Sequence, residues 1–589
     1  MRKTAIIFVV CGILLLAGFG MLQSQQGPDD AKFSKLVDTY LDSYWKFYPT
    51  AATLAGFTKY NDKLEDFSES VIEKRGTEIE ALNKELTTKI SVEKLNSEFQ
   101  IDRQLLLETM DLDLFKLERI VPQEYNPLFY NGILLGSIRS LLVKEFAPLD
   151  ARLKSATERA KKIPELIKQA KANLKTPPKE YTEAAIKQFA AILDFYKTDV
   201  PKLIDSGAAP AKLAFQTELA KVVAALTDYQ NFLQNDLLAK STGNFRLGEG
   251  HQRIFQLTLG GNLQLSELSA QAKADTTNIR REMFLICIPY YKIMDPKIDL
   301  EHPPANVSQD ALQSSIISHV LNKIKGFQPT KEEFFAKVKA TADDLKAFIA
   351  KSGLLDVPEE ALAVEPMTAF DRNAVLARLQ APSLYENSGA YTLFVNPYAD
   401  GLAADLAPSF MDEFTNYYFP VWTWQKVYPG TFFPAVFTRQ NSSLIRRLSA
   451  SPLLVQGWPL YTQDMLIYSG YGNYDLKQRL NELKLKLQAV IDFQLEFGVH
   501  EGSTTKEQAI RLMTGNGFQT QAEAERKWNL IALHPGVAAY PYMGYREILD
   551  LEKDYKQAKG DAFTQKDFLK KLTSYGSLPL RIVKTRIAQ

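Results

Sequence analysis

The chain has 589 residues, of which 46% are hydrophobic and 24% charged, an ordinary globular composition that is long enough to bury a large core. Lys plus Arg number 70 and Asp plus Glu number 69, so no basic excess indicates binding to nucleic acid or to an anionic membrane surface. The 2 cysteines are Cys11 and Cys287. Since Cys11 lies in the N-terminal segment, we expect no disulfide within the body of the protein.

The N-terminal segment has the pattern of an export signal. Arg2 and Lys3 precede an uncharged, largely apolar run over residues 4–22, which is typical of a secretory signal. The run is also just long enough to span a bilayer. Residues 1–24 are therefore a signal peptide or an uncleaved membrane anchor. In both cases the body lies in the periplasm or cell envelope, and only this segment would contact a membrane.

From residue 31 to about 240 the apolar residues recur at helical spacing. Residues 151–178 predict a helix that is interrupted near Pro164 and stopped by Pro177 and Pro178. A later apolar series beginning at Leu476 predicts another helix. The clearest face belongs to a helix near residues 211–238. Its members are Phe215, Leu219, Val222, Leu226, Tyr229 and Leu233.

Residues 390–398 are the one segment with a β-rich pattern, and a proline lies near their end. Such a strand could receive an extended peptide by strand addition, or it could be an ordinary edge strand. Thr504 and Glu507 fit a capping box for a helix that follows them. These features predict a mainly α fold with a small β element.

The sequence contains no P-loop, no G-x-S-x-G, no C-x-x-C and no H-E-x-x-H motif. It has 5 histidines, and none lies within four residues of another, so no helix carries a two-histidine metal site. Acid–base candidates are scattered, with Asp464, Glu496 and Glu501 the ones we considered. A serine triad has no local support, although its members could lie far apart in sequence.

Several segments in order carry a resemblance to a known family. They read FYPTAATLAGFTKYNDKLEDFS, FRLGEGHQRIFQLTL, VYPG, QGWPLY, FGVHEGSTTKEQAI and YGSLPL. From about residue 35 to its end the chain resembles the bacterial family catalogued as domain of unknown function 885, which is similar to zinc metallopeptidases of the gluzincin type. The resemblance implies a large helical fold with a central cleft.

In that family the segment around VYPG reads His-Glu-x-x-Pro-Gly-His-His, and the QGWPLY segment begins with Glu. The resemblance implies that the first His, one of the later pair and that Glu hold zinc, and that the other Glu is the general base. In this chain those positions are Gln425, Lys426, Thr431, Phe432 and Gln456. Neutral amides, an ammonium and a phenyl ring are poor substitutes for zinc ligands. We therefore expect no metal, no cofactor and no catalytic residue of the zinc type.

The frame around the altered positions is kept. Tyr428, Pro429 and Gly430 preserve the turn, and Gly457, Trp458 and Tyr461 preserve the second segment. His500 matches a family Gly-x-His, and it is either a surviving pocket residue or a histidine hydrogen-bonded near a helix start. A late family Tyr falls on Pro541. The residues we considered as cleft residues are Tyr428, Trp458, Tyr461, His500, Tyr540 and Tyr542.

These observations lead to one main reading and two alternatives. The chain is read as an exported, non-catalytic relative of zinc metallopeptidases, a pseudoenzyme that binds a peptide or protein in the inherited cleft. The alternatives are a hydrolase with a metal-independent mechanism in the same cleft, and a structural envelope protein. We expect an N-terminal helical lobe over residues 25–245 and a C-terminal lobe over 246–589, together one family-length unit.

Overall fold

The structure is a computed structural model that describes residues 26–261, 264–296, 307–326, 329–367, 377–386, 389–396 and 412–587. The expected signal or anchor over residues 1–24 lies outside this range. The structure is 74% helical and has a small three-stranded sheet, which confirms the mainly α fold with a small β element. In the part of the chain described, no helix combines the length and the apolar character needed to cross a bilayer.

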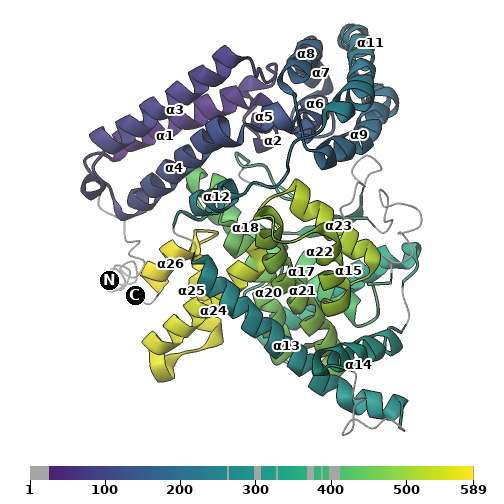
Figure 1. The fold of residues 1–589 in the computed structure, drawn as a ribbon. Coiled ribbons are helices and arrows are strands. Elements are labelled where there is room, and N and C mark those ends of the chain that lie inside the picture. The colour runs from purple at the N-terminus through teal and green to yellow at the C-terminus, as the bar shows by residue number, and fades with distance from the viewer. Residues whose placement is uncertain are drawn as a thin grey trace, which may run out of the picture.

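The first helices form a layer at one corner of the molecule, purple in Figure 1, where α1, α3 and α4 lie side by side. Asn96 caps α4 through its side chain, which accepts from the N–H groups of Glu98 and Phe99. The last turn of α4 widens into a π-helical segment, which ends at Val121 with a positive φ of 47°. The bounds are α1 Asp30–Phe47, α2 Pro49–Ala55, α3 Glu69–Lys89, α4 Ser97–Phe115 and the π segment Lys116–Ile120.

A second bundle follows and has a hydrophobic core of its own. The face predicted for the helix near residue 215 is buried along its whole length, from Phe215 to Leu233. The predicted interruption near Pro164 is confirmed, because two helices meet there. The bounds are α5 Pro122–Tyr125, α6 Pro127–Leu142, α7 Leu149–Ala160, α8 Ile163–Asn173, α9 Lys179–Asp194, α10 Val200–Leu203 and α11 Ala209–Asn231.

The chain then enters its larger core, which joins α1, α3 and α4 to the C-terminal helices. The boundary that we expected at residue 245 stays a prediction, since shared packing does not test whether the parts fold separately. This section holds α12 Glu249–Leu259, α13 Leu265–Met294, α14 Gln309–Lys323 and α15 Lys331–Ser352.

The small sheet corrects the interpretation of residues 390–398 as an edge strand. The strand β3, Tyr391–Val395, lies between β1, Leu362–Pro366, and β2, Ala377–Gln380. It pairs in parallel with β1 and antiparallel with β2. Its hydrogen-bonding groups are already used on both sides, so β3 cannot accept a peptide by strand addition.

The C-terminal half is a stack of helices, green to yellow in Figure 1. The capping box of α22 is Thr505 with Gln508, one residue later than predicted. The N–H of Thr504 instead bonds to the carbonyl of Gly498 and closes the end of α21. The bounds are α17 Tyr418–Lys426, α18 Phe432–Gln440, α19 Leu444–Leu448, α20 Pro452–Tyr468, α21 Leu476–His500, α22 Lys506–Arg511, α23 Gln521–Leu533, α24 Tyr540–Lys559, α25 Gln565–Ser574 and α26 Leu580–Ile587.

Helices α20 and α24 cross in backbone contact. A Cβ on Gly457 would lie 2.3 Å from the carbonyl carbon of Gly544, and a Cβ on Gly544 would lie 1.9 Å from the Leu453 carbonyl oxygen. No side chain larger than hydrogen fits at either position unless the helices separate. This crossing fixes α20, which carries the QGWPLY segment.

Candidate functional site

The segment 424–433 is a tight connection between α17 and α18. The Tyr428–Pro429 peptide is cis. The Gly430 N–H donates to the Trp424 carbonyl at 3.0 Å, and a Cβ on Gly430 would lie 2.1 Å from the Gln425 carbonyl oxygen. Glycine is therefore required where the chain folds back on the end of α17. The Trp458 indole N–H donates to the Pro429 carbonyl at 2.9 Å and joins the turn to α20.

The two glutamines predicted to replace zinc ligands do not bond to each other. The Gln425 amide donates to Gln463 at 2.8 Å, and Gln463 in turn donates to the buried Glu482 at 3.2 Å. Thr431 donates to the Gln425 carbonyl at 2.9 Å. Gln456 lies exposed on α20, seven residues before Gln463. Gln463 is thus the residue on α20 that contacts Gln425, and the sequence comparison missed it.

Lys426 and Phe432 differ sharply in environment. Lys426 is exposed as a residue, but its ammonium is desolvated by surrounding groups, and this desolvation, followed by the nearby Arg526, lowers the pKa of the ammonium to about 8. Phe432 is fully buried. Its ring lies 5.2 Å from the ring of Tyr391 on β3 and 5.2 Å from that of Tyr428. Phe432 therefore fills the space between the turn and the sheet.

These residues do not fit a zinc ion. Zinc in proteins is held by thiolate, imidazole or carboxylate ligands. The positions implied by the resemblance offer two amides, one hydroxyl, one ammonium and one buried phenyl ring. No reaction step through zinc follows from such a set.

A buried charge cluster lies behind Gln463 and is internally paired. Lys486 contacts Asp464 at 2.5 Å and Glu482 at 3.4 Å. Arg479 contacts Glu482 at 2.5 Å and Asp464 at 3.2 Å, and the Tyr545 hydroxyl donates to Asp464 at 2.7 Å. Burial raises the pKa of Glu482, while Lys486 opposes that shift. Asp464 is fully engaged here, and therefore is not positioned as a free acid or base.

The other residues considered for a cleft lie at separate places. The Tyr461 hydroxyl donates to Glu552 at 2.8 Å, and the Tyr542 hydroxyl donates to Asp275 at 2.7 Å. Tyr540 packs on Phe255, with ring centroids 5.4 Å apart. His500 is the last residue of α21 and is buried. It closes α21, and its carbonyl accepts from the N–H of Gly248 at the start of α12 at 3.1 Å, so our two interpretations of His500 stay predictions.

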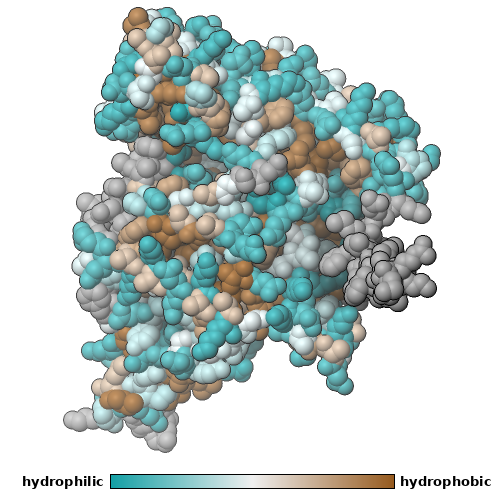
Figure 2. Space-filling view, turned by 180° about the vertical axis from the view of Figure 1, so that it is seen from behind, coloured by the Kyte–Doolittle hydropathy of each residue, from teal (hydrophilic) through white to brown (hydrophobic). Residues whose placement is uncertain are grey.

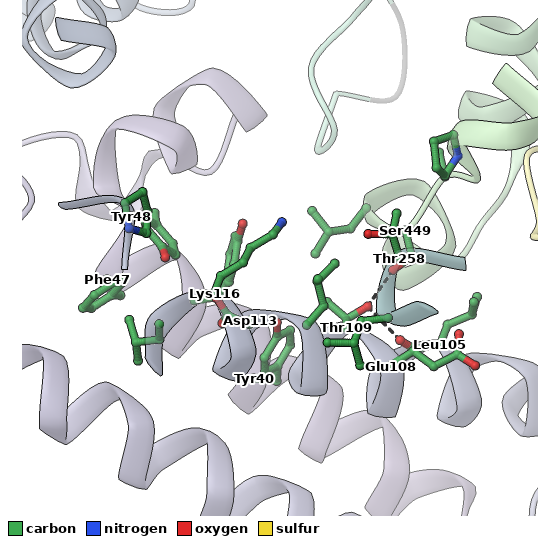
Figure 3. Close-up of a pocket in the computed structure, with 18 of the residues that line it drawn as sticks. Tyr40, Phe47, Tyr48, Leu105, Glu108, Thr109, Asp113, Lys116, Thr258 and Ser449 are labelled. Atoms are coloured by element: carbon green, nitrogen blue, oxygen red, sulfur yellow. Dashed lines mark hydrogen bonds between the residues drawn. The ribbon is translucent and has the colours of Figure 1, made fainter. Parts of the chain in front are cut away.

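A cavity of about 390 Å³ lies elsewhere, between the N-terminal layer and the C-terminal helices. Figure 3 shows its lining from α1 and α4 on one side, with Thr258 and Ser449 facing them. We call it the aromatic cavity. The Thr109 and Ser449 hydroxyls share a hydrogen bond of 2.9 Å across it. Its aromatic lining consists of Tyr40, Tyr44, Phe47, Tyr48, Phe67 and Phe129.

One wall of the aromatic cavity carries charged groups. Asp113 in this wall accepts from the guanidinium of Arg75 at 2.6 Å, and Arg75, which is buried and is not one of the lining residues, lies 5.6 Å from the ring centroid of Tyr40. The Tyr40 hydroxyl is buried and forms no hydrogen bond within the described part of the chain, and burial raises its pKa well above the usual value. Lys116 begins the π-helical segment and lines the same cavity. Desolvation lowers the pKa of its ammonium, although Asp113 opposes the change.

A second cavity of about 280 Å³ adjoins the first and shares Thr258, Ser451 and Pro579 with it. We call it the acidic cavity because Glu267, Glu547 and Asp550 line it. Among the described residues, none of these three carboxylates forms an ion pair. Burial, followed by Asp550, raises the pKa of Glu547 to about 7.

The boundary between the cavities is a fixed ion pair. The Arg581 guanidinium donates to Glu108 at 2.5 Å, and its Nε donates to the Leu259 carbonyl at 2.8 Å. Gly260, with a φ of 64°, ends α12 beside this pair, and a Cβ there would lie 2.3 Å from Arg581. The pair joins α4 to the start of α26. Arg581 also lines the acidic cavity, and its charge together with that of Lys584 opposes the rise in the Glu547 pKa.

The comparison with family models matches residues 49–587 to the family described as "Bacterial protein of unknown function (DUF885)". The chain belongs to this family. The match covers nearly the whole described chain, from the start of α2 to the end of α26. A search of curated proteins finds no match.

Two solved structures share the fold over almost their full length. A Shewanella oneidensis protein described as a "putative lipoprotein of unknown function" is 26% identical, with a TM-score of 0.79 over 95% of this chain and 100% of its own. A Colwellia psychrerythraea protein described as a "putative lipoprotein" is 14% identical, with a TM-score of 0.75 over 95% of this chain and 98% of its own. The second similarity concerns the fold alone.

Proposed function

We propose that this DUF885 member is an extracytoplasmic, non-catalytic binding protein that holds an extended basic peptide across the aromatic and acidic cavities. The observation that carries the proposal is their adjacency, with aromatic rings lining one cavity and the other lined by Arg581 and by three carboxylates that form no ion pair with the described residues. Aromatic and apolar walls with a few polar groups are typical of ligand sites. Unpaired carboxylates attract cationic groups and repel anionic ones.

The charges also suggest an orientation for the peptide. A basic side chain or an N-terminal ammonium would contact Glu547 and Asp550, while apolar side chains would pack on the rings near Tyr48. At the far end Lys116 would meet a carboxylate of the peptide. Lys116 lies at a π-helical segment, a feature frequent at functional sites.

Loss of peptidase chemistry is part of the same proposal. We infer that the turn at Pro429 and Gly430 descends from a gluzincin-like zinc site, because the residues that frame the turn are kept. The side chains now at the ligand positions do not fit zinc. The acid–base candidates we considered are all engaged: Asp464 with Lys486, Glu496 with His251, and Glu501 with Gln252. Each candidate therefore already has a partner, which disfavours a metal-independent hydrolase.

Export is proposed on two grounds. Arg2 and Lys3 precede a long apolar run, which fits a signal peptide or an anchor. Two proteins with the same fold are described as lipoproteins, and lipoproteins are exported. A peptide partner would then be encountered in the periplasm or at the cell envelope.

The experiment compares two labelled pentapeptides on the full-length chain by fluorescence anisotropy: Lys-Lys-Phe-Ala-Glu and its charge-reversed form Glu-Glu-Phe-Ala-Lys. We expect the first to bind about tenfold more tightly or better, since tenfold corresponds to about 1.4 kcal/mol. The double variant Glu547→Gln, Asp550→Asn should remove that preference. The matched control is Asp554→Asn, one turn further along α24 and paired with Lys584 at 3.3 Å.

The pH dependence gives an independent readout. Because the pKa of Glu547 is raised to about 7, its carboxyl ionises as the pH rises through that value, and binding of the basic peptide should strengthen. In Glu547→Gln the binding should vary less with pH. Equal binding of both peptides, or an unchanged preference in the double variant, would contradict the proposal.

A structural role in the envelope is the second candidate. It is favoured by the burial of Trp424, Phe432 and Phe433, which are at most 1% exposed. These rings fill the region where the resemblance implies a catalytic cleft. Failure of both peptides to bind would leave this candidate standing.

A further inference from the structure

Three chemically reactive side chains meet in the core, away from the cavities and from the turn at Pro429. His251 lies on α12, while Glu496 and His500 lie one helical turn apart on α21. All three side chains are 0% exposed. The histidines are separated by about 250 positions in the sequence, so no local sequence motif indicates the cluster.

The contacts are close and converge on one carboxylate oxygen. His251 Nε2 lies 2.7 Å from Glu496 Oε1, and His500 Nε2 lies 3.5 Å from the same oxygen. The imidazole rings stack with centroids 4.3 Å apart. The Gly536 N–H donates to Glu496 Oε1 at 2.6 Å, and His500 Nε2 lies 3.1 Å from the Ile531 carbonyl oxygen.

The protein alone leaves this cluster short of partners. His251 Nδ1, His500 Nδ1 and Glu496 Oε2 are buried and form no hydrogen bond with the described residues. Buried polar atoms almost always have a partner, but these three atoms are not the ones that converge, which are His251 Nε2, His500 Nε2 and Glu496 Oε1. The charge of Arg246 acts on His500, but its guanidinium donates to the carbonyls of Val499 and Thr504. The carboxylate is therefore not neutralised by an arginine.

We propose that His251, Glu496 and His500 bind a structural divalent transition-metal ion, with zinc the best fit. Two imidazoles and one carboxylate form a frequent zinc ligand set. One ligand atom of each residue lies within 4.8 Å of the other two. When zinc is tetrahedral and lies about 2.0–2.1 Å from each ligand atom, the ligand atoms are about 3.3 Å from one another. The observed 3.5 Å matches this separation, and the 2.7 Å contact must lengthen.

The Ile531 carbonyl is the available fourth donor. It lies 3.1 Å from His500 Nε2, about the ligand–ligand separation that a tetrahedral ion requires. A metal here would join α12, α21 and the end of α23 in one site. Since all the side chains are fully buried, no open coordination position faces solvent, and the ion's role is to stabilise the fold rather than to activate water.

This inference is independent of the peptide proposal. It places zinc on different residues from those that the family resemblance implies, and it does not need Gln425 or Gln456. It also predicts that metal enters while the chain folds, because the assembled site is closed. A chelator should therefore remove the ion slowly from the folded protein.

The experiment measures zinc by mass spectrometry in full-length protein purified without chelator from zinc-supplemented cells, and again after unfolding and refolding with zinc chloride. We expect about one equivalent in the unmodified chain. His251→Gln and Glu496→Gln should each lower occupancy more than tenfold, since even outer-shell changes typically cost about 10- to 100-fold in affinity. The matched control is His534→Gln, an exposed histidine three residues after Ile531, which should keep the metal.

Two further measurements keep the test decisive if a variant folds poorly. X-ray absorption on the unmodified chain should show two imidazoles with oxygen ligands around zinc. Refolding with cobalt chloride should give the visible absorption of a tetrahedral cobalt site. An unmodified chain that holds less than about a tenth of an equivalent after both preparations overturns the proposal, and so does zinc retained in both cluster variants.

Discussion

The residues around the turn at Pro429 separate into a buried frame and an exposed rim. Gly430, Gly457 and Trp458 are buried. Backbone atoms lie so close to the two glycines that neither position can hold a side chain. Lys426 and Gln456 are exposed, so their side chains are free of packing constraints. Phe432 is the exception, because it occupies an implied ligand position and is part of the core.

Rebuilding the implied zinc site tests this separation at the residue scale. The variant combines Gln425→His, Lys426→Glu, Thr431→His, Phe432→His and Gln456→Glu. We expect it to bind one zinc equivalent more than the unmodified chain, because the frame holds the rebuilt ligands. A parallel variant adds Gln463→Glu, since Gln463 is the α20 residue that contacts Gln425. Zinc content unchanged in both variants would show that the frame is not an inherited metal site.

Gly544→Ala tests the crossing of α20 and α24. The added methyl group would lie 1.9 Å from the Leu453 carbonyl oxygen, so the helices must separate. Overpacking of this kind typically costs about 1–3 kcal/mol, and we expect the upper end. Urea unfolding followed by circular dichroism measures the change. The control is Gly132→Ala in α6, which meets nothing within 4 Å and should be neutral or stabilising. Equal stability of both variants would contradict the close crossing.

Sequence alone located the turn but not the contacts that define the candidate sites. Gln463 escaped notice because the family comparison points to Gln456, two helical turns earlier. The carboxylates of the acidic cavity come from α13 and α24, and no periodicity links such distant residues. His251 and His500 were examined separately for the same reason.

At the scale of elements, periodicity was a reliable guide wherever one helical face packs on a core. The face from Phe215 to Leu233 is buried, and the break near Pro164 follows from the missing N–H of proline. The position of a strand within its sheet was not predictable. The partners of β3 come from separate segments of the chain, and an alternating pattern does not distinguish a central from an edge strand. The π-helical end of α4 had no sequence signal either.

At the scale of the whole molecule, the proposed peptide site lies where separate parts of the chain meet. The aromatic cavity lies between α1 and α4 on one side and the end of α19 on the other. Viewed from behind, the surface is largely hydrophilic, with separate hydrophobic patches and no single apolar face (Figure 2). A ligand that needs both rings and carboxylates would therefore be held between the parts rather than on that face.

Export is testable on the intact chain. A reporter that is active only outside the cytoplasm, fused after residue 30, should be active, because the basic flank at Arg2 and Lys3 remains inside and the rest is exported. Replacing both basic residues by Glu should lower that activity. A reporter active only in the cytoplasm serves as the control, and activity confined to it would contradict an extracytoplasmic location.

The crossing at Gly457 and Gly544 also limits what a motif can report. Because each glycine is fixed by the backbone of the opposite helix, the Gly-Trp pair is a requirement of the fold, whether or not an ion was ever bound beside it. The same holds for Gly430 against the end of α17. A protein can therefore keep these glycines, and be assigned to the family because of them, whatever side chains occupy the neighbouring positions. The three glycines therefore report the packing of the fold and not the chemistry of the positions beside them.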